Sequence, residues 1–408
     1  MDLLRFSTAG NVDDGKSTLI GRLLLDSGSV PDDQRAAVEQ ASARRGHDGL
    51  DLSLLTDGLK AEREQGITID VAYRYFSTPR RKLIIADSPG HVQYTRNMVT
   101  AASTADLSVI LVDATRGVTE QTKRHASVVA LLRVPHLVVC VNKMDLAGYE
   151  QRAFDRIRAA MESSLARLEL DDVVFLPVSA LAGDNVVATS EKMRWYDGPP
   201  LLSHLESVVV DEDAAARPVR FPVQLVLRAD DGRRYAGSLA SGALRVGDEV
   251  TVLPSGLSSR VQGLEKGGVP VAKAVAPAAV SLRLEDELDV SRGDMIVRRR
   301  EAPRVEQDLE VMVCWMDRRP LAEGRTYTLQ HTTRSARCVV KRVHEQIDMS
   351  TLERTPGEAL LEQNGIGRVT LRASAPLCFD SYASNRATGA LILVDEATQM
   401  TAGAGMLL

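Results

Sequence analysis

Two patterns of hydrophobic and polar residues divide the chain. In about the first 210 residues, short apolar runs such as KLIIADS, LSVILVDA and HLVVCVNK alternate with longer stretches such as KSTLIGRLLLDS, in which apolar residues recur at helical spacing. The short runs are apolar at nearly every position, which is typical of strands covered on both faces. The pattern therefore predicts a parallel β-sheet with helices on each side.

The second half of the chain has a different pattern. From about residue 217, short β-rich segments such as FPVQLVLR and DMIVRRR are separated by glycine-containing turns, and helical periodicity almost vanishes. Regularly spaced short strands favour a closed barrel or a sandwich. Pro303 marks a second boundary, beyond which LEVMVCWM and SARCVVKRV predict another all-β unit. We therefore expect three domains, at residues 1–212, 217–303 and 304–408, the last two as β-barrels.

Composition and charge agree with an ordinary globular protein. The 408 residues are 44% hydrophobic and 26% charged, and the formal net charge of −5 gives no global attraction to nucleic acid or an anionic membrane. The N-terminal stretch lacks the apolar region of a signal peptide, and no apolar run approaches the roughly 18–20 residues of a membrane span. These features predict a cytoplasmic protein. The four cysteines form no CxxC pair, which predicts buried thiols rather than a zinc or redox motif.

A phosphate-binding loop is predicted near the N-terminus. The segment GNVDDGKS, from Gly10 to Ser17, matches the pattern GxxxxGK[ST] between a predicted strand and a predicted helix. In such a loop the backbone N–H groups converge on phosphate oxygens, and the end of the following helix adds positive potential. We expect Lys16 to reach the β- and γ-phosphates, Ser17 to ligate Mg²⁺ and Thr18 to bond the α-phosphate.

Two further segments are expected to respond to the γ-phosphate. Asp87 ends the strand KLIIAD and can hold Mg²⁺ through water, and the N–H of Gly90 can contact the γ-phosphate. Thr68 follows a charged segment and can ligate Mg²⁺ in the triphosphate state. A solvated helix with i,i+4 charge pairs is the alternative interpretation of that segment. His91 can position the attacking water, although a lone histidine is often structural.

The motif NKMD at residues 142–145 is expected to select guanine. The carboxylate of Asp145 can accept hydrogen bonds from both the ring N1–H and the exocyclic amine of guanine, whereas adenine has no donor at N1. Asn142 can bond the outer edge of the purine, and the aliphatic stem of Lys143 can cover the base. A backbone N–H of the turn at Ser179 and Ala180 can meet guanine O6.

Together these motifs predict one site for GTP and Mg²⁺. The residues predicted to bind GTP are Asn11, Val12, Asp13, Asp14, Gly15, Lys16, Ser17, Thr18, Asp87, Gly90, Asn142, Lys143, Asp145, Ser179, Ala180 and Leu181. The predicted Mg²⁺ ligands are Ser17, Thr68 and Asp87, and the predicted catalytic residues are His91, Lys16 and Thr68.

The sequence resembles the translation-factor branch of GTPases in GITI at residues 66–69, the histidine after DSPG, NKMD, and one α/β domain before two β domains. This likeness implies an elongation-factor-Tu-like architecture. A closer resemblance, to the large GTPase subunits of bacterial sulfate adenylyltransferase, covers essentially the whole chain. It is carried by AGNVDDGKSTLIGRLLLDS, AEREQGITIDVAYRYF, HVQYTRNMVTAAST, VSALAGDNV, YAGSLASG, DVSRGDM and GAGM. Elongation factors carry His where Asp14 stands, and Ser88 replaces a familiar threonine at a position with no assigned contact.

The closer resemblance implies a GTPase that works with another chain. In that family a smaller subunit, an adenine-nucleotide α-hydrolase-like enzyme, makes adenosine 5′-phosphosulfate and pyrophosphate from ATP and sulfate, while the large subunit hydrolyses GTP to drive the step. We therefore expect a hetero-oligomer, without membrane or nucleic acid partners. Some relatives carry a fused adenylylsulfate kinase, but this sequence shows no second P-loop, so kinase activity is not expected. The alternatives are a translation factor that binds aminoacyl-tRNA or the ribosome, and a regulatory GTPase subunit without energetic coupling.

Overall fold

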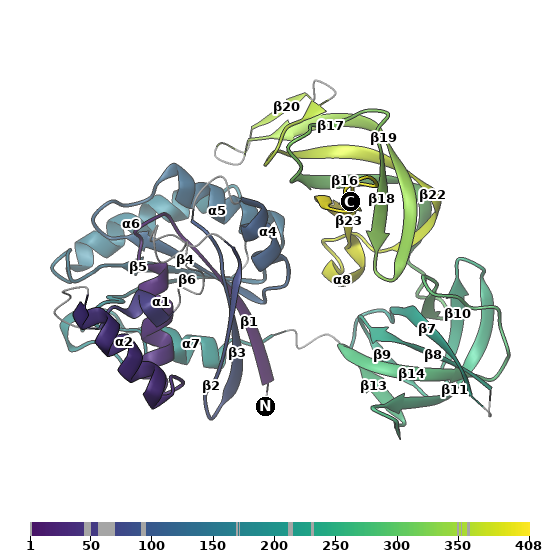
Figure 1. Cartoon of the computed structure of the whole chain (residues 1–408), viewed down its shortest axis with the longest axis horizontal. Coiled ribbons are helices and arrows are strands. Elements are labelled where there is room, and N and C mark those ends of the chain that lie inside the picture. Colours follow the sequence, from purple (N-terminus) through teal and green to yellow (C-terminus); the bar gives the residue numbers. More distant parts are fainter. Residues whose placement is uncertain are drawn as a thin grey trace. The chain divides into compact units, whose positions relative to one another are not determined.

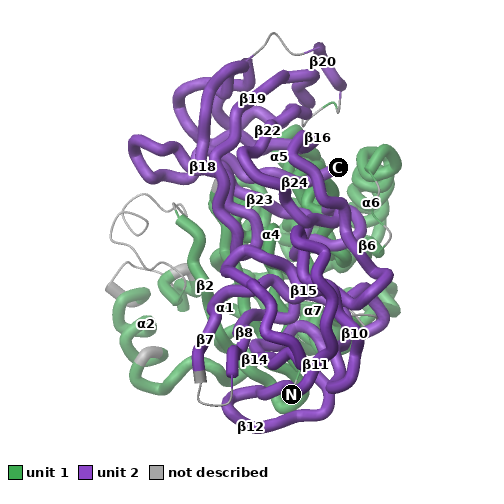
Figure 2. The backbone as a smooth tube through the Cα atoms, turned by 90° about the vertical axis from the view of Figure 1, so that its right-hand side faces the viewer, with its two compact units in different colours: residues 1–210, 349–352 green, residues 211–348, 353–408 purple. Residues whose placement is uncertain are grey.

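The computed structural model describes most of the chain, namely residues 2–44, 50–55, 70–90, 95–168, 170, 172–210, 215–229, 232–348, 351, 353–356 and 360–408. Two compact units are present, of which the first contains residues 1–210 and the second residues 211–348 and 353–408 (Figure 2). Within the described ranges, no helix combines the length and the apolar character needed to cross a membrane.

The first unit is built on a six-stranded sheet with the strand order β2-β3-β1-β4-β5-β6 (Figure 1). β2 runs antiparallel to β3, and the other neighbouring strands are parallel. β4 is buried at all seven positions, as expected for a central strand covered on both faces. The strands are β1 Asp2–Ala9, β2 Ala72–Ser77, β3 Arg81–Asp87, β4 Leu107–Asp113, β5 His136–Asn142 and β6 Asp172–Pro177.

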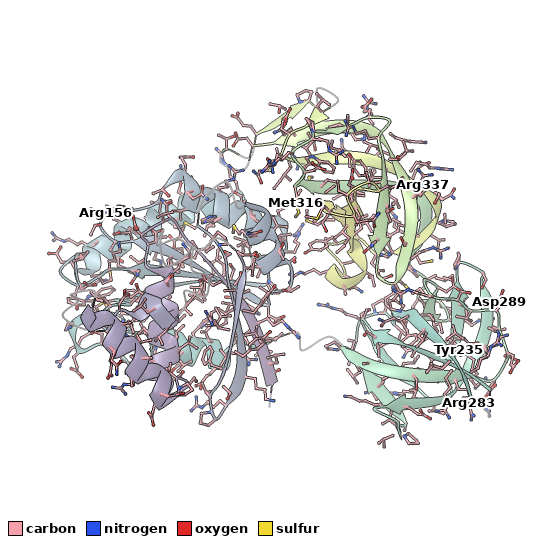
Figure 3. All side chains as sticks on the ribbon, in the orientation of Figure 1. Arg156, Tyr235, Arg283, Asp289, Met316 and Arg337 are labelled. Carbon is pink, nitrogen blue, oxygen red and sulfur yellow. The ribbon has the colours of Figure 1, made fainter. Side chains whose placement is uncertain are left out.

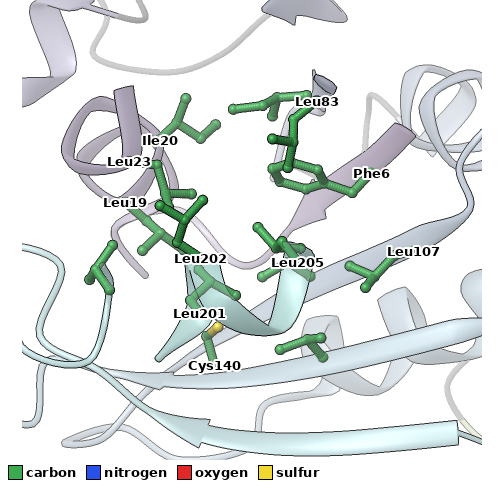
Figure 4. Packing of buried hydrophobic residues seen from close by; sticks show 14 of the residues in the cluster. Phe6, Leu19, Ile20, Leu23, Leu83, Leu107, Cys140, Leu201, Leu202 and Leu205 are labelled. Atoms are coloured by element: carbon green, nitrogen blue, oxygen red, sulfur yellow. The ribbon is translucent and has the colours of Figure 1, made fainter. Parts of the chain in front are cut away.

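Helices cover both faces of this sheet (Figure 1). The helices are α1 Lys16–Asp26, α2 Asp32–Arg44, α4 Thr95–Ser103, α5 Glu120–Leu131, α6 Gln151–Leu165 and α7 Leu201–Ser207, with short 3-10 turns at Leu52–Leu55 and Glu191–Met193. Leu19 and Leu23 of α1 and Leu205 of α7 pack on Phe6 and Leu83 of the sheet (Figure 4). α4, α5 and α6 lie across the sheet from α1 and α7 (Figure 1). The helical spacing of apolar residues predicted for this segment agrees with the buried face of α1.

The second unit contains two β-barrels. In each, a seven-stranded sheet closes on itself, because β10 also pairs with β11 in the first barrel and β18 also pairs with β19 in the second. Six strands thus form each closed ring, and β12 and β20 extend the two sheets. Closure leaves the ring without unpaired strand edges. Buried aromatic residues fill both interiors, including Phe221 and Tyr235 in the first barrel and Trp315 and Tyr327 in the second.

The strands of the two barrel domains have the following bounds; β9 and β13, and likewise β17 and β21, pair in separate two-stranded sheets outside the rings. The first barrel contains β7 Phe221–Ala229, β8 Gly232–Leu239, β9 Ala243–Arg245, β10 Glu249–Leu253, β11 Leu257–Lys266, β12 Val269–Pro270, β13 Lys273–Val275, β14 Ala278–Leu284 and β15 Met295–Arg298. The second contains β16 Arg304–Trp315, β17 Leu321–Ala322, β18 Thr326–His331, β19 Arg334–Ile347, β20 Arg354–Pro356, β21 Leu360–Leu361, β22 Ile366–Phe379, the short helix α8 Arg386–Gly389, β23 Ala390–Val394 and β24 Thr401–Leu407.

A buried ion pair joins the two barrels. The guanidinium of Arg220 donates to both carboxylate oxygens of Asp380, over 2.8 Å in each case, and also to the backbone carbonyl of Glu301. Thr388 donates a further hydrogen bond of 2.6 Å to the same carboxylate. Burial alone would raise the pKa of Asp380, but Arg220 and Thr388 outweigh burial and hold that pKa below its ordinary value. The barrels therefore share this internal electrostatic contact, in addition to the ion pair of 3.6 Å between Arg334 and Asp294.

The predicted fold class, an α/β domain followed by two β-barrels, agrees with this architecture. The two barrels lie in one compact unit, and the three-domain boundaries stay a prediction. All four cysteines are free and buried, as the sequence predicted. Burial raises the pKa of Cys140, at the centre of the first unit, to about 12, so its thiol is not ionised near neutral pH.

Replacing Asp380 by asparagine should destabilise the barrel unit. The variant leaves the buried Arg220 without its counter-charge, and breaking a buried pair in this way lowers the unfolding free energy by roughly 3 kcal/mol or more. Urea unfolding followed by the fluorescence of Trp315, in a Trp195→Phe background, measures the change. Because the folded-state pKa of Asp380 is depressed, the contribution is present above about pH 4 and is lost as the pH falls through that pKa.

A surface pair of the second barrel provides the matched control. Arg337 lies on the outer surface (Figure 3) with its side chain 69% exposed, and it pairs with Glu396 over 2.7 Å. Arg337→Gln should change the unfolding free energy by less than about 1 kcal/mol, because solvent screens an exposed pair. Equal losses in Asp380→Asn and Arg337→Gln would show that the Arg220 joint has no special role.

Candidate nucleotide site

The loop between β1 and α1 has a conformation that only glycine fits at its end. Gly15 caps α1 with a φ of 92°, in the left-handed region. A Cβ added to Gly15 would lie 2.5 Å from Nδ2 of Asn142, so space is lacking as well. Asp14 fixes the loop from within, since its buried carboxylate accepts a hydrogen bond of 2.7 Å from the N–H of Asn11. The loop is therefore a preformed backbone cradle before a helix N-terminus.

Lys16 places a buried ammonium group in this cradle. Its Nζ donates to the carbonyl oxygens of Gly10 and Asn11, over 3.0 and 3.2 Å. Burial lowers the pKa of Lys16, and the carboxylates of Asp87 and Asp14 oppose that shift. A buried cation held by neutral carbonyls gains more from an anionic oxygen, because charge-assisted hydrogen bonds are the stronger kind. The loop is therefore electrostatically suited to a phosphate group.

The end of β3 is pinned beside this loop. Thr8 is the register partner of Asp87, and its hydroxyl donates to Oδ1 of Asp87 over 2.8 Å. Ser88 donates a hydrogen bond of 2.5 Å to the carbonyl oxygen of Thr8. The sequence assigned no contact to Ser88, yet its hydroxyl is buried and fastens the strand end. The carboxylate of Asp87 is thus held at the carboxyl edge of the sheet, next to the loop.

Gly90 lies directly against the phosphate loop. A Cβ added to Gly90 would lie 2.5 Å from the carbonyl oxygen of Gly10 and 2.6 Å from Nζ of Lys16. Any larger residue would push these groups apart. Because Gly90 has no side chain, the backbone of this segment can lie next to the Lys16 ammonium.

The amide of Asn142 joins three loops. Its Oδ1 accepts a hydrogen bond of 2.9 Å from the N–H of Ala180, and its Nδ2 donates over 2.8 Å to the carbonyl of Asp14. The side chain is only 2% exposed. The phosphate loop, the NKMD motif and the turn at Ser179 are therefore connected through one buried side chain. Sequence reasoning predicted a purine contact for Asn142 and missed this role, and the purine contact stays a prediction.

The other NKMD side chains are also held by neighbouring loops. Ser179 donates a hydrogen bond of 2.6 Å to Oδ1 of Asp145. Lys143, whose backbone is left-handed with a φ of 62°, forms an ion pair of 2.8 Å with Asp113 at the end of β4. Burial favours a higher pKa for Asp113, but hydrogen bonds from Lys143 and Thr115 outweigh it, so that pKa lies below its ordinary value. The ion pair with Asp113 therefore fixes the position of the Lys143 side chain in the site.

Sequence reasoning missed Asp113 and Arg22. Asp113 carried a usable signal, because it ends the strand LSVILVD just as Asp87 ends KLIIAD. Arg22 carried none, since it lies in the middle of α1. Its Nε donates to the carbonyl of Ala180 over 3.2 Å, and its Nη2 donates to the carbonyl of Leu181. The turn at residues 179–181 is therefore supported from α1 as well as from Asn142.

The predicted residues that the structure describes converge on the carboxyl ends of the parallel strands, the usual ligand-binding edge of an α/β sheet. Val12, Ser17 and Thr18 are half-buried, and Asp13 is exposed with a φ of 69°. Thr68 and His91 lie outside the described residues, so the metal-binding and catalytic roles predicted for them stay predictions. The direct nucleotide contacts of the other residues also stay predictions.

Comparison with known protein families gives one match in each of the two units. Residues 1–212 match the family described as the Elongation factor Tu GTP binding domain, and residues 308–408 match the GTP-eEF1A C-terminal domain-like family. The first match covers slightly more than half of the chain.

Relatives that match essentially the whole of this chain define its family more specifically. The chain is 52% identical over 412 residues to sulfate adenylyltransferase subunit 1 of Laribacter hongkongensis (strain HLHK9), with 100% of this chain and 85% of the relative covered. It is 49% identical over 409 residues to sulfate adenylyltransferase subunit 1 of Salmonella arizonae (strain ATCC BAA-731 / CDC346-86 / RSK2980), with 99% and 85% covered. It is 54% identical over 412 residues to the bifunctional enzyme CysN/CysC of Mycobacterium tuberculosis (strain ATCC 25618 / H37Rv), of which it spans 67%. The chain therefore belongs to the elongation-factor-Tu-type GTPases, within the family of sulfate adenylyltransferase subunit 1.

Proposed function

We propose that this chain hydrolyses GTP to drive the formation of adenosine 5′-phosphosulfate and pyrophosphate from ATP and sulfate on a smaller partner subunit. The observation that carries the proposal is the Asn142 joint, which holds the phosphate loop, the NKMD motif and the Ser179 turn around one position. The sequence pairs its P-loop motif with a guanine-selective motif. We therefore assign the ATP and sulfate chemistry to the partner, an adenine-nucleotide α-hydrolase-like subunit, in a cytoplasmic hetero-oligomer.

The proposed phosphate contacts start from the preformed loop. The N–H groups of residues 11–15 bind the phosphate oxygens, and the hydroxyl of Thr18 bonds the α-phosphate. Lys16 exchanges the carbonyls of Gly10 and Asn11 for oxygens of the β- and γ-phosphates. Because Lys16 is buried, its charge acts on the developing negative charge with little screening by water.

Mg²⁺ is the proposed metal, and the residues at hand fit it. Ser17 and Asp87 offer the hard oxygen ligands that Mg²⁺ prefers, and Thr8 orients the Asp87 carboxylate. Ser17 is proposed as a direct ligand, Asp87 as a ligand through water, and Thr68 as the ligand added in the triphosphate state. When bound, the metal neutralises charge on the β- and γ-phosphates.

The proposed guanine pocket lies at the NKMD motif. Asp145, held by Ser179, accepts from the N1–H and the exocyclic amine of guanine, and the stem of Lys143 covers the base. Since the N–H of Ala180 donates to Asn142, the N–H of Leu181 is the proposed donor to guanine O6.

Hydrolysis is proposed to depend on Gly90 and His91. The N–H of Gly90 contacts the γ-phosphate, and His91 positions the attacking water. Loss of the γ-phosphate removes the Gly90 contact and releases the segment. This change can drive chemistry elsewhere only if the partner subunit binds the GTP and GDP forms with different affinity.

The function test compares the chain with and without its small subunit. The purified complex should form more adenosine 5′-phosphosulfate when GTP is present than when GDP is present, and should release phosphate from GTP at the same time. A product yield that does not depend on GTP would contradict energetic coupling. Salt-sensitive binding of aminoacyl-tRNA by the isolated chain would instead support a translation factor.

Lys16→Ala should abolish GTP turnover, because the β- and γ-phosphates lose their buried positive partner. Nucleotide affinity, measured by isothermal titration calorimetry, should fall by at least about tenfold. Lys123→Ala in α5 is the control, since Lys123 pairs with Glu120 on the surface. Wild-type affinity and rate in Lys16→Ala would refute the loop assignment.

Asp145→Asn should change base preference from guanine toward xanthine. The amide NH₂ matches the carbonyl that xanthine carries where guanine has an amine, while the amide oxygen can still accept from Ser179. Competition binding of XTP and GTP measures the ratio, which should move by about tenfold or more toward XTP. If XTP binds no better than it does to the wild type, Asp145 does not read the base.

A further inference from the structure

Two side chains of α5, outside the predicted nucleotide contacts, form a hydrogen-bonded pair, and one of them, Gln121, reaches Gly90. Gln121 and His125 are four residues apart and therefore share one face of the helix. Nε2 of Gln121 lies 3.3 Å from the carbonyl oxygen of Gly90 and 2.8 Å from Nε2 of His125. These two contacts, from Gly90 to Gln121 and from Gln121 to His125, link the segment beside the proposed γ-phosphate position to helix α5.

Hydrogen-bond chemistry fixes the direction of each contact. A carbonyl oxygen only accepts, so the atom of Gln121 that faces Gly90 is the amide nitrogen, a donor. The second hydrogen of that amide is then given to Nε2 of His125, which accepts. The ring hydrogen of His125 consequently lies on Nδ1, and the imidazole is neutral. One glutamine amide therefore donates both of its hydrogens, one to the backbone and one to the ring.

The surroundings of His125 keep it in this form. The side chain is 2% exposed, and burial, followed by the positive charges of Lys16 and Arg124, lowers the pKa of His125 to about 3. Its Nδ1 is buried and has no hydrogen-bond partner among the residues that the structure describes. Within that part of the chain, the hydrogen-bonding atoms of this buried ring therefore have one partner, the Gln121 amide.

α5 is a firm support for this contact. The helix begins in a capping box, in which Thr119 and Thr122 each bond the backbone N–H of the other. Gln121 lies in that first turn. Gly90 also lies against Gly10 and Lys16, where a Cβ would have no room. The backbone of Gly90 is therefore in contact with both the phosphate loop and the Gln121 amide.

We infer that Gln121, held by His125, is a positioning residue for GTP hydrolysis, because it fixes the carbonyl of Gly90 and so directs the backbone that enters the γ-phosphate position. The inference rests on the proposed function of Gly90. The pair is not among the proposed nucleotide or metal contacts and acts through Gly90. Its effect should therefore appear in the hydrolytic step and in binding of the triphosphate, and not in binding of GDP, which lacks the γ-phosphate.

Gln121→Glu tests the donor. The variant keeps the shape of the side chain, but a carboxylate cannot donate and would repel the Gly90 carbonyl. The value of kcat for GTP should fall by about 10- to 100-fold, as expected when a reacting group is misplaced, while the Kd for GDP stays within about twofold of the wild type. Gln121→Met, which is neutral and similar in length, should give the same split and serves if the carboxylate prevents folding.

The histidine is tested by rescue. His125→Leu removes the acceptor and should lower kcat as Gln121→Met does. His125→Gln places an amide oxygen where Nε2 stood, and should restore at least half of the wild-type kcat. Glu120→Gln is the matched control, because Glu120 lies on the same helical turn, is 70% exposed and pairs with Lys123. It should leave both kcat and the GDP Kd unchanged.

The outcomes separate the inference from the proposed function. A wild-type chain that does not hydrolyse GTP refutes the proposed function. If the wild type is active, an unchanged kcat in Gln121→Met overturns the positioning role. An equal loss of GDP affinity and kcat in both Gln121 variants, or failure of His125→Gln to rescue, also overturns it, because the pair would then support only the general structure of the unit.

Discussion

The nucleotide site depends on the hydrogen bonds of one buried amide. Asn142 has a donor and an acceptor on the same planar group, and it uses them in opposite directions, toward Asp14 and toward Ala180. Each partner is a backbone group of a different loop, and a buried backbone group left unbonded is destabilising by about 1–3 kcal/mol. Asn142 therefore helps to fix the spacing between the phosphate-binding and base-binding parts, together with Arg22 of α1. Gly15 is required for the same reason, since a Cβ there would displace this amide.

Much of the fold could be predicted from the sequence because the signals were local. The apolar runs that became β4 and β5 are buried almost throughout, and the helical spacing of KSTLIGRLLLDS became α1. The change to short strands after residue 217 likewise predicted the barrels. The contact between Arg220 and Asp380 could not be predicted, because it spans 160 positions and neither residue belongs to a motif.

The residues of the candidate site also fall into those that have a local signal in the sequence and those that have none. The motif residues Lys16, Asp87 and Asp145 were identified because their spacing and their places at strand ends are properties of the sequence. Their supporting residues were not, because Arg22 and Gln121 bond groups 158 and 31 positions away, and Arg22, Gln121 and His125 resemble ordinary helix residues. Ser88 shows the same limit, since a hydroxyl group at that position gave no indication that it would bond the neighbouring strand.

The Arg220–Asp380 contact also has a consequence for how force passes through the barrel unit. Two barrels that were connected only by a flexible linker would move independently. A motion imposed on one barrel would then not be transmitted to the other. The buried pair, reinforced by Thr388 and by the bond between Asn385 and Ser241, instead resists relative rotation of the barrels. A protein that binds one barrel and displaces it therefore displaces the other barrel as well, so the two barrels move as a single body.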